Sequence, residues 1–288
     1  MVLDNRKKAS VVGAITQTTG ETLERAAGIS DLGAALTGNL PGVVTVASSG
    51  MPGEENPTII VRGASSWNGS TPLVLVDGVK RDDGLSTVDM ASVESISVLK
   101  DASATAVFGV EGANGVILIT TKRGREGKAQ INVSANAIMK MPSKLPNKLD
   151  SYDALMALNT SLEHELNSNP ESWQNMRPQY FIDNYRNQTT IEQKERYPNV
   201  DWQDATFKKY AMSYNANINV SGGNKFVRYF TSVDYVNEGD LFKKYSTGRD
   251  YEGGYSYNRV NVRANLDFNF TKTTLFKVGI AGSAAFQK

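Results

Sequence analysis

The chain has 288 residues, enough for two domains, and its 31 basic and 30 acidic residues give a formal net charge of +1. This balance provides no general electrostatic attraction for nucleic acid. The absence of cysteine excludes disulfides and thiolate metal sites, and one histidine, His164, cannot form a His-rich metal cluster. No apolar run approaches the ~20 residues of a membrane-spanning helix, and Met1–Lys8 is polar and basic without the apolar segment of a signal peptide.

Residues 10–127 are rich in glycine and small side chains, and they predict a small mixed α/β domain. Turn signals such as Pro41-Gly42 and Asp77-Gly78 separate short β-branched runs. Two helices are expected, over residues 31–40 with Asp31 as N-cap and over residues 102–108 with Asp101 as N-cap. The expected strands are Val43–Ala47, Thr58–Arg62, Leu73–Val76, Val93–Leu99 and Gly115–Thr121.

From about Lys128 the expected strands become long, and apolar and polar residues alternate along them. In residues 211–220, the apolar side chains from Met212 to Val220 share one face, and serine and asparagine side chains share the other. This period of two predicts a sheet with two chemically different faces. The expected strands are residues 129–139, 211–220, 226–236, 258–270 and 275–287, with the alternation less strict in 226–236 and 275–287.

The alternation alone fits a soluble β-sandwich and a membrane barrel equally well. Three features favour the barrel. The strands are about 10–13 residues long, against ~5–6 in soluble sheets. Aromatic residues gather near strand ends, as in interfacial girdles. Finally, tight connections at residues 222–225 and 271–273 alternate with long ones at about 140–210 and 237–257, the first of which contains an expected helix over residues 151–166.

Several runs of the chain resemble one known family, the SusC/RagA-type TonB-dependent transporters. The most specific are residues 89–109 (DMASVESISVLKDASATAVFG) and residues 112–124 (GANGVILITTKRG), which look like part of that family's plug domain. The remaining similar runs are Leu36–Val43, Ile59–Ala64, Pro72–Val79, Val200–Asp204 and Asn219–Gly223.

The resemblance implies an α+β plug domain over residues 1–127, which we call the plug region, and antiparallel transmembrane β-barrel strands over residues 128–288, which we call the barrel region. About five strands of an incomplete barrel are expected, and the family's TonB-binding segment would precede Arg6. An open five-stranded sheet leaves unpaired edge groups in lipid, so the sequence predicts part of a larger or split barrel.

The function that the resemblance implies is TonB-dependent import of large nutrients, glycans (oligosaccharides) or peptides, across the outer membrane of a Gram-negative, Bacteroidota-like bacterium. The implied partners are TonB, a SusD-like surface lipoprotein, the substrate and outer-membrane lipid, with no nucleic acid. Two alternatives remain open at this stage. One is a truncated or split fragment that acts as a non-transporting binding module, and the other is a secreted β-sandwich enzyme that acts on glycans.

No catalytic residue, cofactor or metal site is predicted, and the chain is not expected to be an enzyme. There is no Gly-x-Ser-x-Gly elbow, and the glycines from Gly109 to Gly115 precede a strand rather than a helix, unlike a nucleotide loop. Charge pairs that control plug release are a hypothesis for Arg62, Asp77 and Lys100, although Asp77 equally fits a simple turn residue. The side chains expected to face the barrel lumen are Asn215, Asn217, Asn219, Arg259, Asn261, Arg263 and Asn265.

Overall fold

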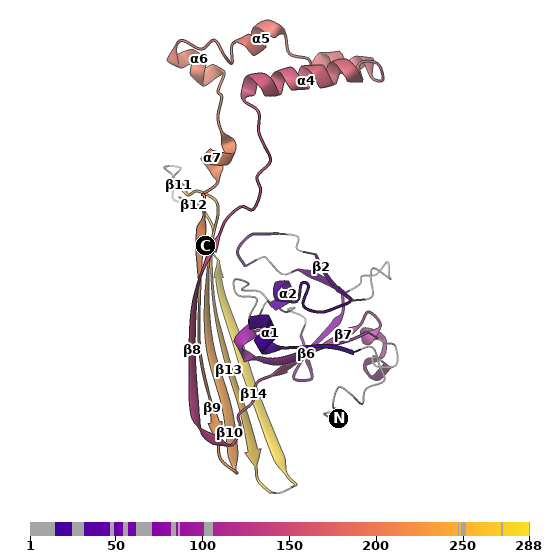
Figure 1. Cartoon of the computed structure of the whole chain (residues 1–288), viewed down its shortest axis with the longest axis vertical. Helices are drawn as coiled ribbons and strands as arrows, with labels where there is room; N and C mark the ends of the chain where they lie inside the picture. Colours follow the sequence, from indigo (N-terminus) through magenta and orange to yellow (C-terminus); the bar gives the residue numbers. More distant parts are fainter. Residues whose placement is uncertain are drawn as a thin grey trace. The chain divides into compact units, whose positions relative to one another are not determined.

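The computed structural model describes residues 15–24, 32–46, 49–53, 57–61, 71–81, 85, 87–100, 106–246, 248, 252–271 and 273–287. The chain divides into two compact units (Figure 1). The first unit contains Met1–Lys140, Met212–Asp240 and Gly254–Lys288, and the second contains Met141–Ala211 and Leu241–Gly253.

A five-stranded sheet in the order β1-β6-β7-β4-β5 organises the plug region. Its strands are β1 (Ile15–Thr19), β4 (Leu73–Val76), β5 (Val79–Lys80), β6 (Val93–Leu99) and β7 (Val116–Thr121). Only the β4–β7 pair is parallel. The separate hairpin of β2 (Val43–Val46) and β3 (Thr58–Val61) and the helices α1 (Gly20–Glu24) and α2 (Leu32–Ala35) add to the region. The apolar side chains of these sheets and helices form two buried clusters, and the larger one includes Leu23, Leu32, Val61, Ile96 and Ile117.

The five strands expected in the plug region are confirmed to within a residue over their described parts. The expected helix over residues 31–40 is wrong in length. After α2 ends at Ala35, Gly38 adopts a φ of 75°, the left-handed conformation that terminates helices, and hydrogen-bonded turns replace further helix. The expected helix over residues 102–108 is also corrected. Its described part belongs to the 3₁₀ segment η3 (Ala106–Gly112), which is kinked at Gly109, while residues 101–105 lie outside the description.

Five long antiparallel strands form a second sheet in the order β14-β13-β10-β9-β8, which we call the long-strand sheet (Figure 1). Its strands are β8 (Gly127–Lys140), β9 (Ala211–Gly223), β10 (Val227–Gly239), β13 (Ser256–Asn269) and β14 (Leu275–Gln287). All five strands expected in the barrel region are therefore confirmed, each of them 13 or 14 residues long. Strands β8 and β14 are the two edges, so the sheet is not closed.

The two tight connections are set by local hydrogen bonds. Between β9 and β10, the Asn224 side chain accepts hydrogen bonds from the backbone N–H groups of Phe226 and Val227, each at 2.8 Å. Between β13 and β14, the Thr271 hydroxyl accepts from the Thr274 N–H at 2.9 Å. Asparagine and threonine in such positions replace main-chain partners in a turn, and they fix the register of each hairpin.

The outer face of the long-strand sheet is apolar and exposed. Ile131, Ile218, Val262 and Ile280 are each at least half exposed on it. Next to the tight turns, the rings of Phe226, Phe268, Phe270 and Phe276 contact one another at centroid distances of 5.8–6.4 Å. This arrangement has the apolar band and aromatic girdle of strands that face lipid.

The second unit consists mainly of short helices. They are α4 (Ser151–Glu165), η4 (Pro170–Asn175), α5 (Gln179–Asp183), α6 (Ile191–Arg196) and α7 (Trp202–Thr206), accompanied by the short strands β11 (Tyr245–Ser246) and β12 (Glu252–Gly253). The helix expected over residues 151–166 is confirmed as α4, and Asp150 caps it through the Asp153 N–H at 2.8 Å. None of the helices in the described ranges has both the length and the apolar character needed to cross a bilayer.

Candidate functional site: a polar interface between the plug region and the strands

Polar side chains cover the inner face of the long-strand sheet, which is the face that contacts the plug region. Strand pairing brings the polar residues of β10 and β13 into adjacent rows, with Ser232 opposite Arg263 and Asp234 opposite Asn261. Buried polar groups require partners, and here the plug region supplies many of them. The polar residues of the two strands that are buried are Ser232, Asp234, Glu238, Arg259, Asn261, Arg263, Asn265 and Asp267.

Asp89 connects the plug region to the sheet. Its Oδ1 accepts a hydrogen bond from the Ala91 N–H at 2.8 Å and thereby caps the 3₁₀ helix η2 (Met90–Ser92). Its Oδ2 accepts from Ser232 Oγ at 2.9 Å and from Asn217 Nδ2 at 3.2 Å, both on the sheet. Burial raises the pKa of the Asp89 carboxyl above its ordinary value, although the hydrogen bonds from Ala91 and Ser232 and nearby positive charges oppose that shift.

Asp77 links the end of β7 to the sheet. Its carboxylate accepts from the Thr121 N–H at 3.0 Å and from the Thr121 hydroxyl at 2.5 Å, and Arg263 Nη1 lies 3.9 Å away. The Asn265 amide donates to the Thr121 hydroxyl and to the Lys122 carbonyl, each at 2.8 Å. The last strand of the plug region is therefore tied to β13 by side chains of both parts.

Residues 122–126, which join β7 to β8 and which we call the connector, lie close against the sheet. Arg123 Nη1 donates to Asp267 Oδ1 at 2.7 Å, and Arg228 lies 3.9 Å from the same carboxylate. At Gly124, a Cβ atom would lie 2.3 Å from the backbone nitrogen of Tyr229 on β10, so only glycine fits this approach.

Of the three charge-pair candidates, only Asp77 has described contacts with the sheet. Lys100 Nζ donates to Thr16 Oγ1 at 2.7 Å and to the Pro41 carbonyl, so its described contacts lie inside the plug region. Arg62 lies outside the described residues. Their role in plug release remains a prediction.

The residues predicted to face the lumen all lie on the polar faces of β9 and β13. Asn217, Asn265 and Arg263 contact or approach the plug region, as described above. Asn215 and Asn261 instead donate to Asp234 on β10, at 3.4 and 3.2 Å. The remaining two, Asn219 and Arg259, help to line the cavity described next. That this face lines the lumen of a closed barrel remains a prediction.

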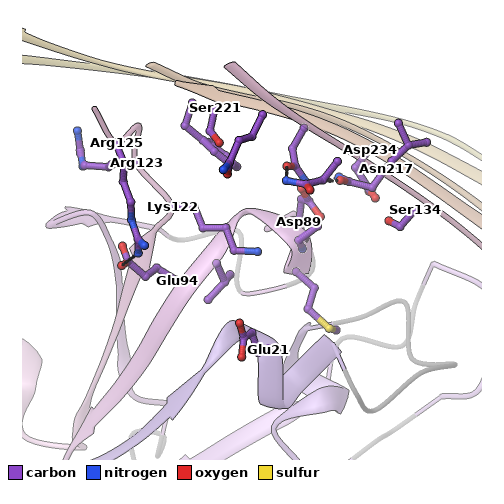
Figure 2. Close-up of a pocket in the computed structure, with 18 of the residues that line it drawn as sticks. Glu21, Asp89, Glu94, Lys122, Arg123, Arg125, Ser134, Asn217, Ser221 and Asp234 are labelled. Atoms are coloured by element: carbon purple, nitrogen blue, oxygen red, sulfur yellow. Dashed lines mark hydrogen bonds and ion pairs between the residues drawn. The ribbon is translucent and has the colours of Figure 1, made fainter. Parts of the chain in front are cut away.

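A polar cavity of about 1170 Å³ lies between the plug region and strands β8 and β9 (Figure 2). Amide side chains of the two strands form one side, and charged side chains of the plug region and connector form the other. Such groups can hydrogen-bond to water and to polar solutes, but the described residues contain no group of three or more His, Asp or Glu side chains arranged for a metal ion. The principal polar lining residues are Glu21, Asp89, Glu94, Lys122, Arg125, Gln130, Asn132, Asn136, Asn215, Asn217 and Asn219.

Sequence reasoning did not single out Asp89, Ser232, Asp234 or Asp267 as interface residues. The sequence did contain a signal that the Asp89 side chain has a defined position, because an aspartate directly before a helical turn is a typical N-cap, and Asp89 directly precedes η2. Asp234 and Ser232 lie two residues apart on β10 and so share one face, but Phe230 and Val236 lie on that face too, and the weaker alternation of this strand hid the polar pair. That Ser232 meets Asp89 and Asp267 meets Arg123 is decided by tertiary contacts.

Comparisons with known proteins agree with this architecture. Residues 7–116 match the family of the TonB-dependent receptor plug domain. A TonB-dependent receptor of Formosa agariphila is 32% identical over 244 residues, covering 83% of this chain and 22% of that protein. The TonB-dependent receptor SusC of Bacteroides thetaiotaomicron is 33% identical over 223 residues, covering 72% of this chain and 19% of SusC. The chain thus spans about a fifth of the length of the curated relatives it matches.

Among solved structures, the RagAB peptide importer in its "open-open" state superposes with a TM-score of 0.72 at 24% identity, covering 99% of this chain and 32% of that chain. This likeness shows the fold, an α+β plug domain with antiparallel strands of a partial transmembrane barrel. The plug match and the SusC relative, together with this shared fold, show that the chain belongs to the SusC/RagA-type family of TonB-dependent receptors.

Proposed function

We propose that the protein carrying this chain imports large nutrients, glycans or peptides, across the outer membrane of a Gram-negative, Bacteroidota-like bacterium, and that the plug region gates the barrel lumen. The observation that carries this proposal is the polar character of the interface between the plug region and the sheet. Hydrogen bonds and ion pairs there, such as Asp89 to Ser232 and Arg123 to Asp267, can be exchanged for bonds to water at a small net free-energy cost. An interface of this kind can hold the plug region and still let it separate.

The proposed energy source is TonB, which would act on the N-terminal side of the plug region. The position of β1 supports this. It is an edge strand, paired only with β6 through five residue pairs. Lys100 adds one further connection from β1, at Thr16, to the Pro41 carbonyl. Force on the N-terminal side would therefore first break the β1–β6 pairing and the contacts of Lys100, which makes Lys100 the charge candidate best placed to set the release threshold.

The proposed partners outside the membrane are a SusD-like surface lipoprotein and the substrate. The second unit supports such contacts because Trp173, Tyr180 and Trp202 are 64%, 74% and 72% exposed on it. Exposed aromatic side chains are enriched where proteins bind other molecules. The RagAB relative is described as a peptide importer, so peptides stand beside glycans as the proposed substrate class.

The test is uptake by bacteria that lack the chromosomal gene and carry the full-length protein, with and without a functional TonB. Cells would be grown on defined oligosaccharide mixtures or on peptide mixtures. In a second arm, Thr121→Cys and Asn265→Cys would place a cysteine pair where the plug region meets β13, at the 2.8 Å hydrogen bond from Asn265 Nδ2 to Thr121 Oγ1, and mass spectrometry would verify that the oxidised pair forms a disulfide. The native chain contributes no competing cysteine.

We expect TonB-dependent growth with the unmodified protein, loss of uptake when the cysteine pair is oxidised, and recovery after reduction. Each single-cysteine variant is the matched control and should transport under both conditions. Wild-type cells that take up neither substrate class would contradict import. Recovery of the protein in the soluble fraction, with ligand binding but no uptake, would instead favour a non-transporting binding module.

A further inference from the structure

We propose that Asp89 is a positioning residue that seats the plug region, by serving as the terminal acceptor of a directed hydrogen-bond chain that runs across the long-strand sheet. The inference rests on the proposed gating function and adds a contact that the charge-pair hypothesis did not include. Figure 2 shows Asp89 extending from the plug region toward Asn217 and the strands above it.

The chain of hydrogen bonds begins at the edge strand β8. Asn132 Nδ2 donates to Asn219 Oδ1 at 3.1 Å, and Asn219 Nδ2 donates to Asn217 Oδ1 at 3.1 Å. Asn217 Nδ2 then donates to Asp89 Oδ2 at 3.2 Å. Asn219 and Asn217 each accept on the oxygen and donate onward from the nitrogen, so all three bonds run in one direction, from β8 through β9 to the plug region.

Ser232 on β10 joins the same end point. Its hydroxyl accepts from Asn217 Nδ2 at 3.1 Å and donates to Asp89 Oδ2 at 2.9 Å. A hydroxyl has one proton, and here that proton is directed to Asp89. Two strands therefore present donors to one oxygen, while the other oxygen of Asp89 caps η2 within the plug region.

This arrangement requires a side chain that only accepts. An ionised carboxylate has acceptor sites on both oxygens and no donor, whereas an asparagine has one oxygen, so its NH₂ group would face either Asn217 Nδ2 or the Ala91 N–H. Asp89 is 6% exposed, and the same burial that makes its bonds strong also penalises its charge. The contact can hold the plug region in place without making release prohibitive, because a displaced Asp89 regains water.

The test is a charge swap in the full-length protein, read out as leak through the barrel in planar lipid bilayers and as entry of a large antibiotic into cells. The variants are Asp89→Asn, Asn217→Asp and the two combined. In Asp89→Asn, the new NH₂ group opposes a backbone or side-chain N–H donor that the carboxylate had accepted from. In Asn217→Asp, the new carboxylate opposes the carboxylate of Asp89. In the combined variant, Asn at position 89 donates to Asp at position 217, so the pair is restored with its polarity reversed.

We expect each single change to raise leak about tenfold, in line with losing a hydrogen bond to a charged group, and the combined change to bring leak back to within about threefold of the unmodified protein. Ser232→Ala, a smaller change, should raise leak by about threefold, because Asn217 still donates. Glu111→Gln is the matched control, since Glu111 is exposed and its ion pair with Lys80 stays inside the plug region. It should leave leak unchanged.

A combined variant that leaks as much as either single variant would overturn the proposal, and so would an Asp89→Asn protein that seals normally. Heat-modifiable migration on gels verifies that each variant contains a folded barrel. Leak does not depend on TonB or on substrate. If the unmodified protein shows no TonB-dependent uptake, the proposed function fails while the charge swap still reports on Asp89.

Discussion

At the scale of single residues, Asp77 shows how one side chain serves both the turn and the interface. Its φ of 50° and the φ of 85° at Gly78 form the left-handed pair that a two-residue hairpin turn requires, and Asp tolerates this conformation better than most residues. The same carboxylate binds Thr121 and lies 3.9 Å from Arg263. The two interpretations that the sequence left open are thus compatible, and a gating role for Asp77 remains a prediction.

The glycine at position 124 offers a sharp residue-scale test. Gly124→Ala would place a methyl group 2.3–2.4 Å from the backbone nitrogen and oxygen of Tyr229, and backbone atoms cannot move aside cheaply. We expect the contact between connector and β10 to weaken by about 1–3 kcal/mol. Faster hydrogen–deuterium exchange in β10 around Tyr229, measured on the full-length protein, would report this.

Gly282→Ala on β14 is the matched control for this substitution. No atom lies within 4 Å of where its Cβ would be, so exchange should stay as in the unmodified protein. Equal exchange rates for the two alanine variants would show that the close approach at Gly124 does not constrain the connector.

At the scale of secondary-structure elements, each long strand has one apolar face and one mainly polar face. Along β13, buried polar residues such as Asn261 and Arg263 alternate with the apolar Val260, Val262 and Ala264. A shift of one residue in register would exchange the two sets. The hairpin turns at Asn224 and Thr271 hold the register, because their side chains replace main-chain partners at fixed positions.

An arginine scan distinguishes the two faces of these elements. Ile280→Arg puts a charge on the apolar outer face of β14, where the native side chain is 64% exposed. If this face meets lipid, the substitution should cost roughly 2–4 kcal/mol near the bilayer centre and lower the yield of folded protein in outer membranes. Asn136→Arg on β8, which lines the polar cavity, should fold with normal yield. Equal yields for the two variants would argue against a lipid-facing outer surface.

At the scale of the whole molecule, the chain divides into a unit that carries the plug region and the long strands and a unit made from the two long connections. The second unit has its own internal contacts. The Asn159 side chain of α4 both accepts from the Arg177 N–H at 2.9 Å and donates to the Arg177 carbonyl at 2.7 Å. The rings of Phe181, Tyr185 and Tyr197 pack edge to face at 5.5–5.8 Å. These contacts give the unit a structure of its own.

The independence of the second unit is testable through Asn159. Asn159→Ala removes both hydrogen bonds to Arg177 and should destabilise the packing of α4 locally by about 1–3 kcal/mol. Hydrogen exchange should accelerate in residues 151–183 and remain unchanged in β6, β7 and β13. Alanine at the exposed Asn167 is the control. Faster exchange across the plug region as well would mean that the two units unfold together.

Features that depend on neighbouring residues could be predicted from the sequence, whereas features that depend on distant residues could not. Strand positions in both regions, the two tight turns and helix α4 follow from alternation, turn residues and capping, all of which act over a few residues. The helix expected to reach Leu40 failed because a single left-handed glycine, Gly38, outweighed the helical pattern around it. Strand β1 (ITQTT) and helix α1 (GETLE) were not predicted, because each contains a single apolar residue and so lacks the apolar run that marks the equally short strands β2, β3 and β4.

The sequence by itself determined which residues of each long strand share a face, because that depends only on the two-residue period of an extended chain. Family membership also followed from it, through the specific runs at residues 89–124. The pairing of Asp89 with Asn217 and Ser232, and of Arg123 with Asp267, was decided only by tertiary structure. These partners are 128 to 144 residues apart along the chain, and no local preference specifies how a plug sheet packs on a neighbouring wall of strands.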